Sequence, residues 1–76
     1  MEQESLAKHV GRLVRHLRID AGLSQEQFAN ECGLHRTYVG AIERGEKTIS
    51  IETANKLAKA FGFSLAEFFQ KLEEDF

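Results

Sequence analysis

The sequence predicts an all-α fold, a compact domain of five short helices that spans residues 1–76. Three observations support this prediction. Apolar residues recur at intervals of three and four, serines stand where helices would begin, and glycines stand where they would end. The sequence also contains no proline and no alternation of apolar and polar residues that would indicate strands.

The first two predicted helices are separated by Gly22. The first helix carries its apolar residues at helical spacing, at Leu6, Val10, Leu13, Val14 and Leu17. The second runs from Ser24 to Glu31 and opens with a capping box, in which Ser24 and Gln27 each accept a hydrogen bond from the other residue's backbone N–H. Its side chain Phe28 is expected to be buried.

The third predicted helix follows a turn at Gly33, where a left-handed backbone costs little, and runs from His35 to Arg44. Val39 and Ile42 fall on one face, which can be buried. Polar side chains occupy the outer surface, namely Arg36, Thr37 and Arg44, with Tyr38 at its edge. The helix therefore has one face for the core and one row of hydrogen-bonding groups left for another purpose.

The last two predicted helices are rich in large apolar residues. The fourth is capped by Ser50, closed by Gly62 and apolar at Ile51, Ala54, Leu57, Ala58 and Phe61. The fifth starts at a second capping box, formed by Ser64 and Glu67, and aligns Leu65, Phe68, Phe69 and Leu72. We expect the preceding helices to be covered by Phe61, Leu65 and Phe68. An exposed apolar patch would remain and form a dimer interface, comprising Phe63, Phe69 and Leu72.

Composition narrows the class of protein. A chain of 76 residues, 42% hydrophobic and 29% charged, is typical of one small globular domain. No apolar run approaches the roughly 20 residues of a membrane span, no signal peptide is visible, and one cysteine cannot form an intrachain disulfide, so we expect a cytoplasmic location and no membrane partner. The net charge is −2, and the surplus acid lies after Lys47. Overall charge therefore neither supports nor excludes nucleic-acid binding.

The sequence contains no residue pattern that is typical of a catalytic site or a metal site. Cys32 and His35 form a lone C-x-x-H, and His9 and His16 lie seven residues apart, but a zinc site needs about four ligands at matching spacing. Cys32 is better interpreted as a small apolar residue in the turn. There is no glycine-rich phosphate loop and no nucleophile with an evident base. We therefore expect no enzymatic activity, metal, cofactor or small-molecule ligand.

The second and third predicted helices form a helix-turn-helix pattern, in which a turn of about three or four residues containing glycine joins two short helices. In such a unit the first helix crosses the DNA phosphate backbone. The second lies in the major groove, with its N-terminal residues against the base edges. The outer row of the third predicted helix is then a surface that reads DNA.

The segment LRIDAGLSQEQFANECGLHRTYVGAIERGEKTIS resembles the helix-turn-helix family of the phage lambda, Cro and 434 repressors, often called the XRE family. With the later LAKAFGFSLAEFF, it is most similar to the small controller proteins of restriction–modification systems. The resemblance covers roughly Leu13 to Phe69. It implies a lambda-repressor-like fold, a homodimer and specific binding to a roughly palindromic operator in double-stranded DNA. Controllers of this kind regulate their own promoter and that of the endonuclease gene.

The resemblance also implies individual DNA contacts. Gln25 matches a position that holds the DNA backbone, and Tyr38 matches one whose hydroxyl reaches phosphate. Arg36 and Thr37 match base-reading positions. Arginine can make a bidentate pair with guanine O6 and N7, and threonine offers a hydroxyl or a methyl group.

Five further residues receive roles in the same way. Arg44 and Lys47 flank the end of the third helix, where we expect phosphate contacts. His35 stands at its start and belongs to the expected DNA-binding surface, although aspartate, serine or threonine would be a better cap there. Arg18 and Glu43 match a pair that joins the first and third helices as a buried ion pair.

Alternative interpretations remain open. An exposed arginine on a short helix is often merely solvated, and Tyr38 could be half-buried against the first helix of the motif. The domain could also be an antitoxin or a phage-type repressor whose helix-turn-helix binds a protein partner. Only seven residues follow Phe69, which leaves little room for a toxin-neutralising segment.

Overall fold

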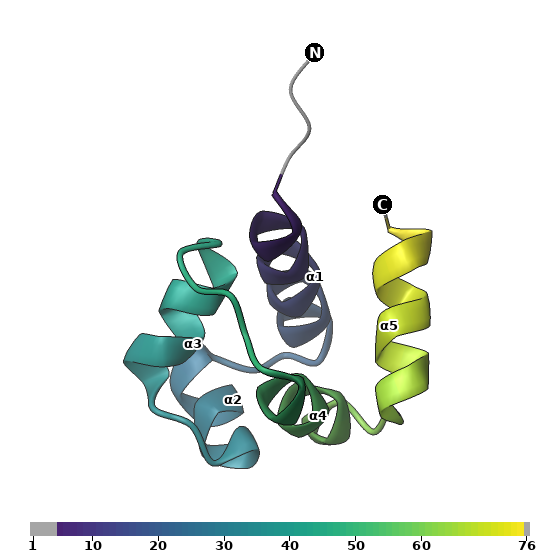
Figure 1. Ribbon diagram of the computed structural model, residues 1–76. Helices are drawn as coiled ribbons and strands as arrows, with labels where there is room; N and C mark the ends of the chain where they lie inside the picture. Colours follow the sequence, from purple (N-terminus) through teal and green to yellow (C-terminus); the bar gives the residue numbers. More distant parts are fainter. Residues whose placement is uncertain (1–4, 76) are drawn as a thin grey trace.

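A computed structural model describes residues 5–75, and within them five α-helices follow one another with no strand between them (Figure 1). They are α1 (Leu6–Asp20), α2 (Gln25–Cys32), α3 (Arg36–Glu43), α4 (Ile51–Ala60) and α5 (Leu65–Glu74). The predicted all-α class with five helices is confirmed. Positions 1–4 and 76 of the predicted domain lie outside the described residues.

Most of the helices begin at a serine, because the hydroxyl accepts a hydrogen bond from a backbone N–H that has no partner within the helix. The serine caps of α1, α2, α4 and α5 are Ser5, Ser24, Ser50 and Ser64. Both predicted capping boxes are present, at the starts of α2 and α5. Glycines with φ between 72° and 78° follow α1, α2, α3 and α4. The predicted starts and stops are therefore right to within a residue or two.

The core lies where the five helices meet. Its largest fully buried side chains come from all of them and are Val14, Phe28, Val39, Ile42, Leu57 and Phe68. The ring of Phe28 on α2 stacks on that of Phe61, the cap residue at the end of α4, with centroids 4.5 Å apart. The apolar faces of α2 and α3 are thus completed by α1 and α4, which hold the pair in a fixed position (Figure 1).

A glycine allows α1 and α3 to approach closely. A Cβ atom at Gly11 would overlap the carbonyl oxygen of Ile42 and lie 2.7 Å from that of Glu43. Both obstacles are backbone atoms, so no side-chain rotation could relieve the overlap. Gly11 therefore sets the distance between α1 and the helix that carries the predicted reading surface.

The C-terminal aromatic residues partly follow the prediction. Phe68 is fully buried, and Phe61 and Leu65 are half-buried against the core. Leu72 was expected to be exposed, and this expectation is wrong, because its side chain is only 7% exposed and belongs to the core. Since Leu72 lies one turn after Phe68, both residues share the inner face of α5.

The other two residues of the predicted patch have different neighbours. The ring of Phe63 is half-buried, 6.3 Å from that of Phe61, and the Lys71 ammonium lies 5.0 Å from its centroid. Phe69 is 38% exposed and lines a different surface, described below. The prediction of one continuous patch is therefore wrong, since of its three residues only Phe69 is left exposed.

Candidate nucleic-acid interface

The turn between α2 and α3 places the third helix against the second. Gly33 has φ +72°, and its N–H and that of Leu34 donate to carbonyls in the last turns of α2. Leu34 is half-buried against the core. The start of α3 is consequently held both by backbone hydrogen bonds and by an apolar contact.

His35 caps α3 through its ring. The imidazole Nδ1 accepts a hydrogen bond of 3.1 Å from the backbone N–H of Thr37. Because Nδ1 is the acceptor, the proton of the neutral ring is assigned to Nε2, which is left as a donor on an exposed residue. The histidine thus performs the capping function for which aspartate, serine or threonine would be the usual choice.

The first turn of α3 presents the two predicted base-reading residues. Arg36 and Thr37 are exposed, and Arg36 is the first residue of the helix. A guanidinium in this position offers parallel N–H donors to a guanine edge without first losing a buried contact. The structure therefore leaves the start of the predicted reading surface accessible.

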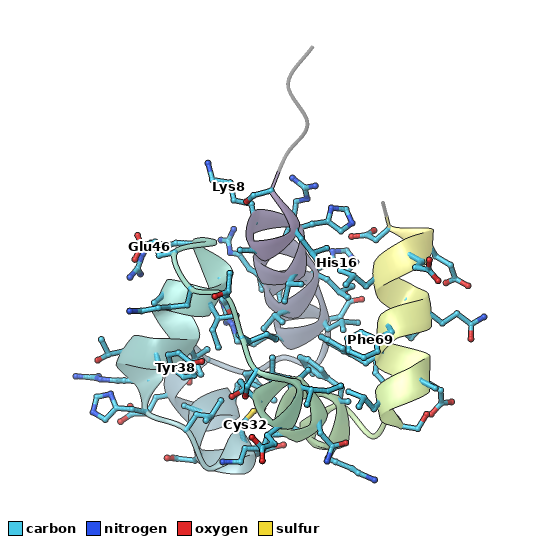
Figure 2. The ribbon with its side chains drawn as sticks, viewed as in Figure 1. Lys8, His16, Cys32, Tyr38, Glu46 and Phe69 are labelled. Atoms are coloured by element: carbon cyan, nitrogen blue, oxygen red, sulfur yellow. The ribbon has the colours of Figure 1, made fainter. Side chains whose placement is uncertain are left out.

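Tyr38 lies one residue further along α3 and is labelled in Figure 2. Its side chain is half-buried and packs against the core. Tyr38 was interpreted either as a phosphate contact or as a half-buried side chain, and its position agrees with the second interpretation. The hydroxyl contact with phosphate stays a prediction.

An ion pair joins α1 to α3 below this surface. Arg18 Nε donates to Glu43 Oε2 at 2.6 Å and Nη2 donates to Oε1 at 3.1 Å, while Nη1 donates to the Leu23 carbonyl at 2.8 Å. The two charged side chains are 11% and 3% exposed. The hydrogen bond to Glu43 raises the pKa of Arg18, so the guanidinium stays charged.

Gln25 connects this pair to the start of α2. Its Nε2 donates to Glu43 Oε1 at 3.0 Å, and the residue is exposed. The bond uses one of the two N–H groups of the amide, so the second is available to a phosphate. The contact between Gln25 and Glu43 had no counterpart in the sequence analysis, because the residues are 18 positions apart.

The end of α3 holds a second ion pair that the sequence analysis missed. Arg44 Nε donates to Glu46 Oε2 at 2.9 Å and Nη2 donates to Oε1 at 3.2 Å. This pair lowers the pKa of Glu46 and raises that of Arg44. Lys47 follows and is exposed. The sequence Arg44-Gly45-Glu46 could have indicated this ion pair. A left-handed glycine after a helix folds the chain back on the last turn, which brings the residues on either side of the glycine together.

The residues considered for metal binding do not converge. Within residues 5–75, no three histidine, cysteine, aspartate or glutamate side chains are placed to hold a metal ion. Cys32, the last residue of α2, is 7% exposed, and burial raises the pKa of its thiol to about 11. Cys32 is therefore an apolar core residue, as interpreted.

None of the helices within residues 5–75 is long and apolar enough to cross a membrane.

An apolar hollow of about 250 Å³ lies between α1, α5 and the segment that leads into α4. Its rim carries three exposed apolar side chains, Leu6 at 57%, Ile51 at 64% and Phe69 at 38%. Figure 2 shows Phe69 on the side of α5 that faces the body of the protein. Leu6 and Ile51 were not expected at an interface, because each was assigned to the buried side of its helix.

Comparison with known proteins shows similarity to regulators. Residues 14–68 match the helix-turn-helix family. The chain is 45% identical over 53 residues to control protein C.BamHI of Bacillus amyloliquefaciens, a match that covers 68% of this chain and 65% of that protein. The matches to the first curated relatives span 58% to 65% of those proteins' lengths.

Solved structures of controller proteins have the same fold. The restriction–modification controller protein C.AhdI from Aeromonas hydrophila is 41% identical, with a TM-score of 0.77 over 83% of this chain and 96% of that chain. The controller protein C.Esp1396I, solved as a tetramer in complex with its natural 35 base-pair operator, is 27% identical, with a TM-score of 0.85 over 96% of each chain. The predicted resemblance to this family and to its controllers is confirmed.

Proposed function

Because the chain belongs to the helix-turn-helix family, we propose that it is a transcriptional regulator that binds a specific sequence in double-stranded DNA through α2 and α3. The observation that carries the proposal is the exposed first turn of α3, where Arg36 and Thr37 extend from a helix whose other face is buried. Side chains at this place in such a unit meet the base edges of the major groove. The phosphates on either side of the groove are assigned to four further residues, Gln25, Tyr38, Arg44 and Lys47.

We propose further that the regulated genes are those of a restriction–modification system, including the gene of the protein itself. The similarity to control protein C.BamHI and to the controllers C.AhdI and C.Esp1396I supports this choice. Methyltransferase and endonuclease genes next to the coding sequence are the expected genomic context. An adjacent toxin gene would instead identify an antitoxin, and a prophage setting a phage-type repressor.

The binding unit in this proposal is a homodimer joined at the apolar hollow. Leu6, Ile51 and Phe69 surround the hollow and leave apolar surface in water, and such surfaces mark interaction sites. A two-fold axis uses the same surface twice, so no second protein is needed. Two copies of α3 related in this way reach successive major-groove faces about 34 Å apart, which requires a roughly palindromic operator.

The proposal assigns the protein no enzymatic activity, metal, cofactor or small-molecule ligand, because the recognition described needs only side chains of the chain itself. It places the protein in the cytoplasm, where a bacterial promoter is reached. The single-domain organisation, with reading helices in the middle of the chain and dimer contacts near its C-terminal helix, is part of the same proposal.

The test begins with selection of bound duplexes from a random library, which should return one consensus with two-fold symmetry. Arg36→Ala should then cost about 1–3 kcal/mol on that operator and relax preference at one base position. Gln25→Ala should weaken binding to operator and random duplex alike, because phosphate contacts carry no sequence information. Lys56→Ala, which removes an exposed cation on α4, serves as the control.

Two results would contradict the proposal. A selection that returns no consensus would remove sequence-specific binding as the function. Equal losses for Arg36→Ala on operator and on random duplex would show that Arg36 contacts only phosphate.

A further inference from the structure

We propose that Glu46 restrains DNA binding by holding Arg44 in an ion pair that competes with DNA phosphate for the guanidinium. This inference rests on the DNA-binding function proposed above. The residues assigned to the DNA surface so far all favour binding, whereas Glu46 would oppose it. The relevant atoms are the Arg44 Nε and Nη2 donors and the two Glu46 carboxylate oxygens, which pair at 2.9 and 3.2 Å.

Hydrogen bonds of the backbone hold the turn that carries Glu46 in place beside the end of α3. The Gly45 N–H donates to the Ile42 carbonyl at 3.0 Å, and the Glu46 N–H donates to the Ala41 carbonyl at 3.0 Å. These two bonds, around a glycine with φ +74°, fold the chain back over the end of α3. A Cβ atom at Gly45 would lie 2.7 Å from the Cα of Lys8, so α1 closes the other side of the turn.

The guanidinium of Arg44 lies along the outer side of α3. Gly40 has no side chain, and a Cβ atom there would lie 3.1 Å from Arg44 Nη1 and 3.5 Å from Gln25 Oε1. The Arg44 head group and the Gln25 amide therefore cover the same point on the helix, beside the proposed phosphate contact of Gln25. Arg44 is thus already beside a site proposed for phosphate, but its fork of donors is directed at a carboxylate.

A phosphate would have to displace that carboxylate. The side chains of Arg44 and Glu46 are 58% and 55% exposed, so the pair is in contact with water and is weak compared with the buried pair of Arg18 and Glu43. The pair nevertheless occupies one of the two edges through which the guanidinium can bind a phosphate bidentately, the edge formed by Nε and Nη2. Glu46 also leaves a negative charge beside any phosphate that approaches Arg44.

Its removal should therefore free one phosphate contact. Binding of a fluorescent 20-base-pair duplex of random sequence, followed by anisotropy over a salt series, measures this directly. Glu46→Gln should bind about two- to fivefold more tightly, the range expected from breaking an exposed ion pair. The slope of log affinity against log salt should steepen by about 0.9, the value for one additional phosphate contact.

The double variant identifies the route of the effect. In an Arg44→Ala background, Glu46→Gln should give a much smaller gain in affinity, because no guanidinium remains to be released and only the repulsion between Glu46 and phosphate is removed. The matched control is Glu74→Gln, which makes the same change of charge on α5, and it should leave random-duplex binding unchanged.

The outcomes separate the inference from the proposed function. Wild-type binding with no gain for Glu46→Gln overturns the inference and leaves DNA binding intact. An equal gain in the Arg44→Ala background, or for Glu74→Gln, assigns the effect to overall charge and also overturns it. A wild type that binds neither random duplex nor operator at low salt overturns both.

Discussion

At the residue scale, Glu43 serves the fold and the proposed DNA surface together. Its carboxylate accepts hydrogen bonds from Arg18 on α1 and from Gln25 on α2, while its own backbone ends α3. Three helices are thus joined at one buried group. The Gln25 amide is therefore oriented by a carboxylate whose counter-charge is the Arg18 guanidinium.

Glu43→Gln should destabilise the protein strongly, because it leaves the Arg18 guanidinium charged and buried without a counter-charge. The expected cost is on the order of 3–5 kcal/mol, from a total near 5–10 kcal/mol for a domain of this size. Thermal and urea unfolding without DNA measure it. Glu46→Gln makes the same change in an exposed pair, which water screens, and should change the free energy of unfolding far less. A fall in melting temperature of only a degree or two for Glu43→Gln would contradict the structural role.

Cys32 should make stability depend on pH in alkaline solution. Its thiol pKa is raised from 9.0 to about 11 by burial, so between these values the unfolded chain loses a proton that the folded chain keeps. The contribution to stability is fully present below pH 9.0 and is lost as the pH rises through about 11.

Urea unfolding at several pH values from 8 to 11 checks this prediction. Cys32→Ala should show a shallower decline of stability over the same range, since it lacks the titrating thiol. Parallel declines for the two proteins would show that other groups account for the whole effect.

At the element scale, the starts and ends of the helices were predictable from the sequence, but contacts between residues far apart in the sequence were not. A capping box needs only residues three apart, so Ser24 with Gln27 and Ser64 with Glu67 were found from the sequence. His35 was judged a poor cap, because propensities describe the hydroxyl and carboxylate acceptors that usually serve and say little about an imidazole nitrogen.

The proposed site shows the same division between local and long-range contacts. The exposure of Arg36 and Thr37 followed from helical spacing, which separates an inner from an outer face. The pairing of Arg18 with Glu43 joins residues 25 apart and was available only through the resemblance. The burial of Leu72 depends on how α5 rotates against α1 and α4, which no local pattern specifies.

Gly11→Ala should force α1 and α3 apart, because the added carbon overlaps backbone atoms at residues 42 and 43. Overpacking costs about 1–3 kcal/mol or more, and the better helix propensity of alanine offsets about 1 kcal/mol of this. Because the overlap is with backbone atoms, the cost should lie at the upper end of this range, about 2–3 kcal/mol, and the net loss in urea unfolding should be about 1–2 kcal/mol. Arg15→Ala, an exposed change on the same helix, should remain within about 0.5 kcal/mol of wild type. A Gly11→Ala variant as stable as wild type would show that the helices can separate at no cost.

At the scale of the whole molecule, the apolar hollow is the surface that the proposed dimer would cover. Its rim of Leu6, Ile51 and Phe69 comes from three separate helices, so the surface exists only when the chain is folded. Dimerisation there would couple DNA occupancy to protein concentration, which gives a self-regulating gene a delay before it responds.

Analytical ultracentrifugation of the wild type and of Phe69→Glu tests the dimer. Phe69 is 38% exposed, so dimerisation buries only this remainder, which contributes about 0.6–1.1 kcal/mol in each copy. Since the loss occurs twice, the variant should raise the dissociation constant at least about tenfold and weaken operator binding. Phe63→Leu keeps an apolar side chain in the loop before α5, outside the lining of the hollow, and should remain dimeric. A wild type that stays monomeric at micromolar concentration and on DNA would rule the dimer out.

The stacked rings of Phe28 and Phe61 make the helix-turn-helix a poor unit for transplantation. Residues 24–45 contain most of the side chains assigned to DNA, yet their apolar faces are covered by α1 and α4. Excised as a peptide, this segment would expose Phe28, Val39 and Ile42 to water and lose the pairing of Glu43 with Arg18. A new operator preference is therefore better engineered by replacing Arg36 and Thr37 within the intact domain than by grafting α3 onto another scaffold.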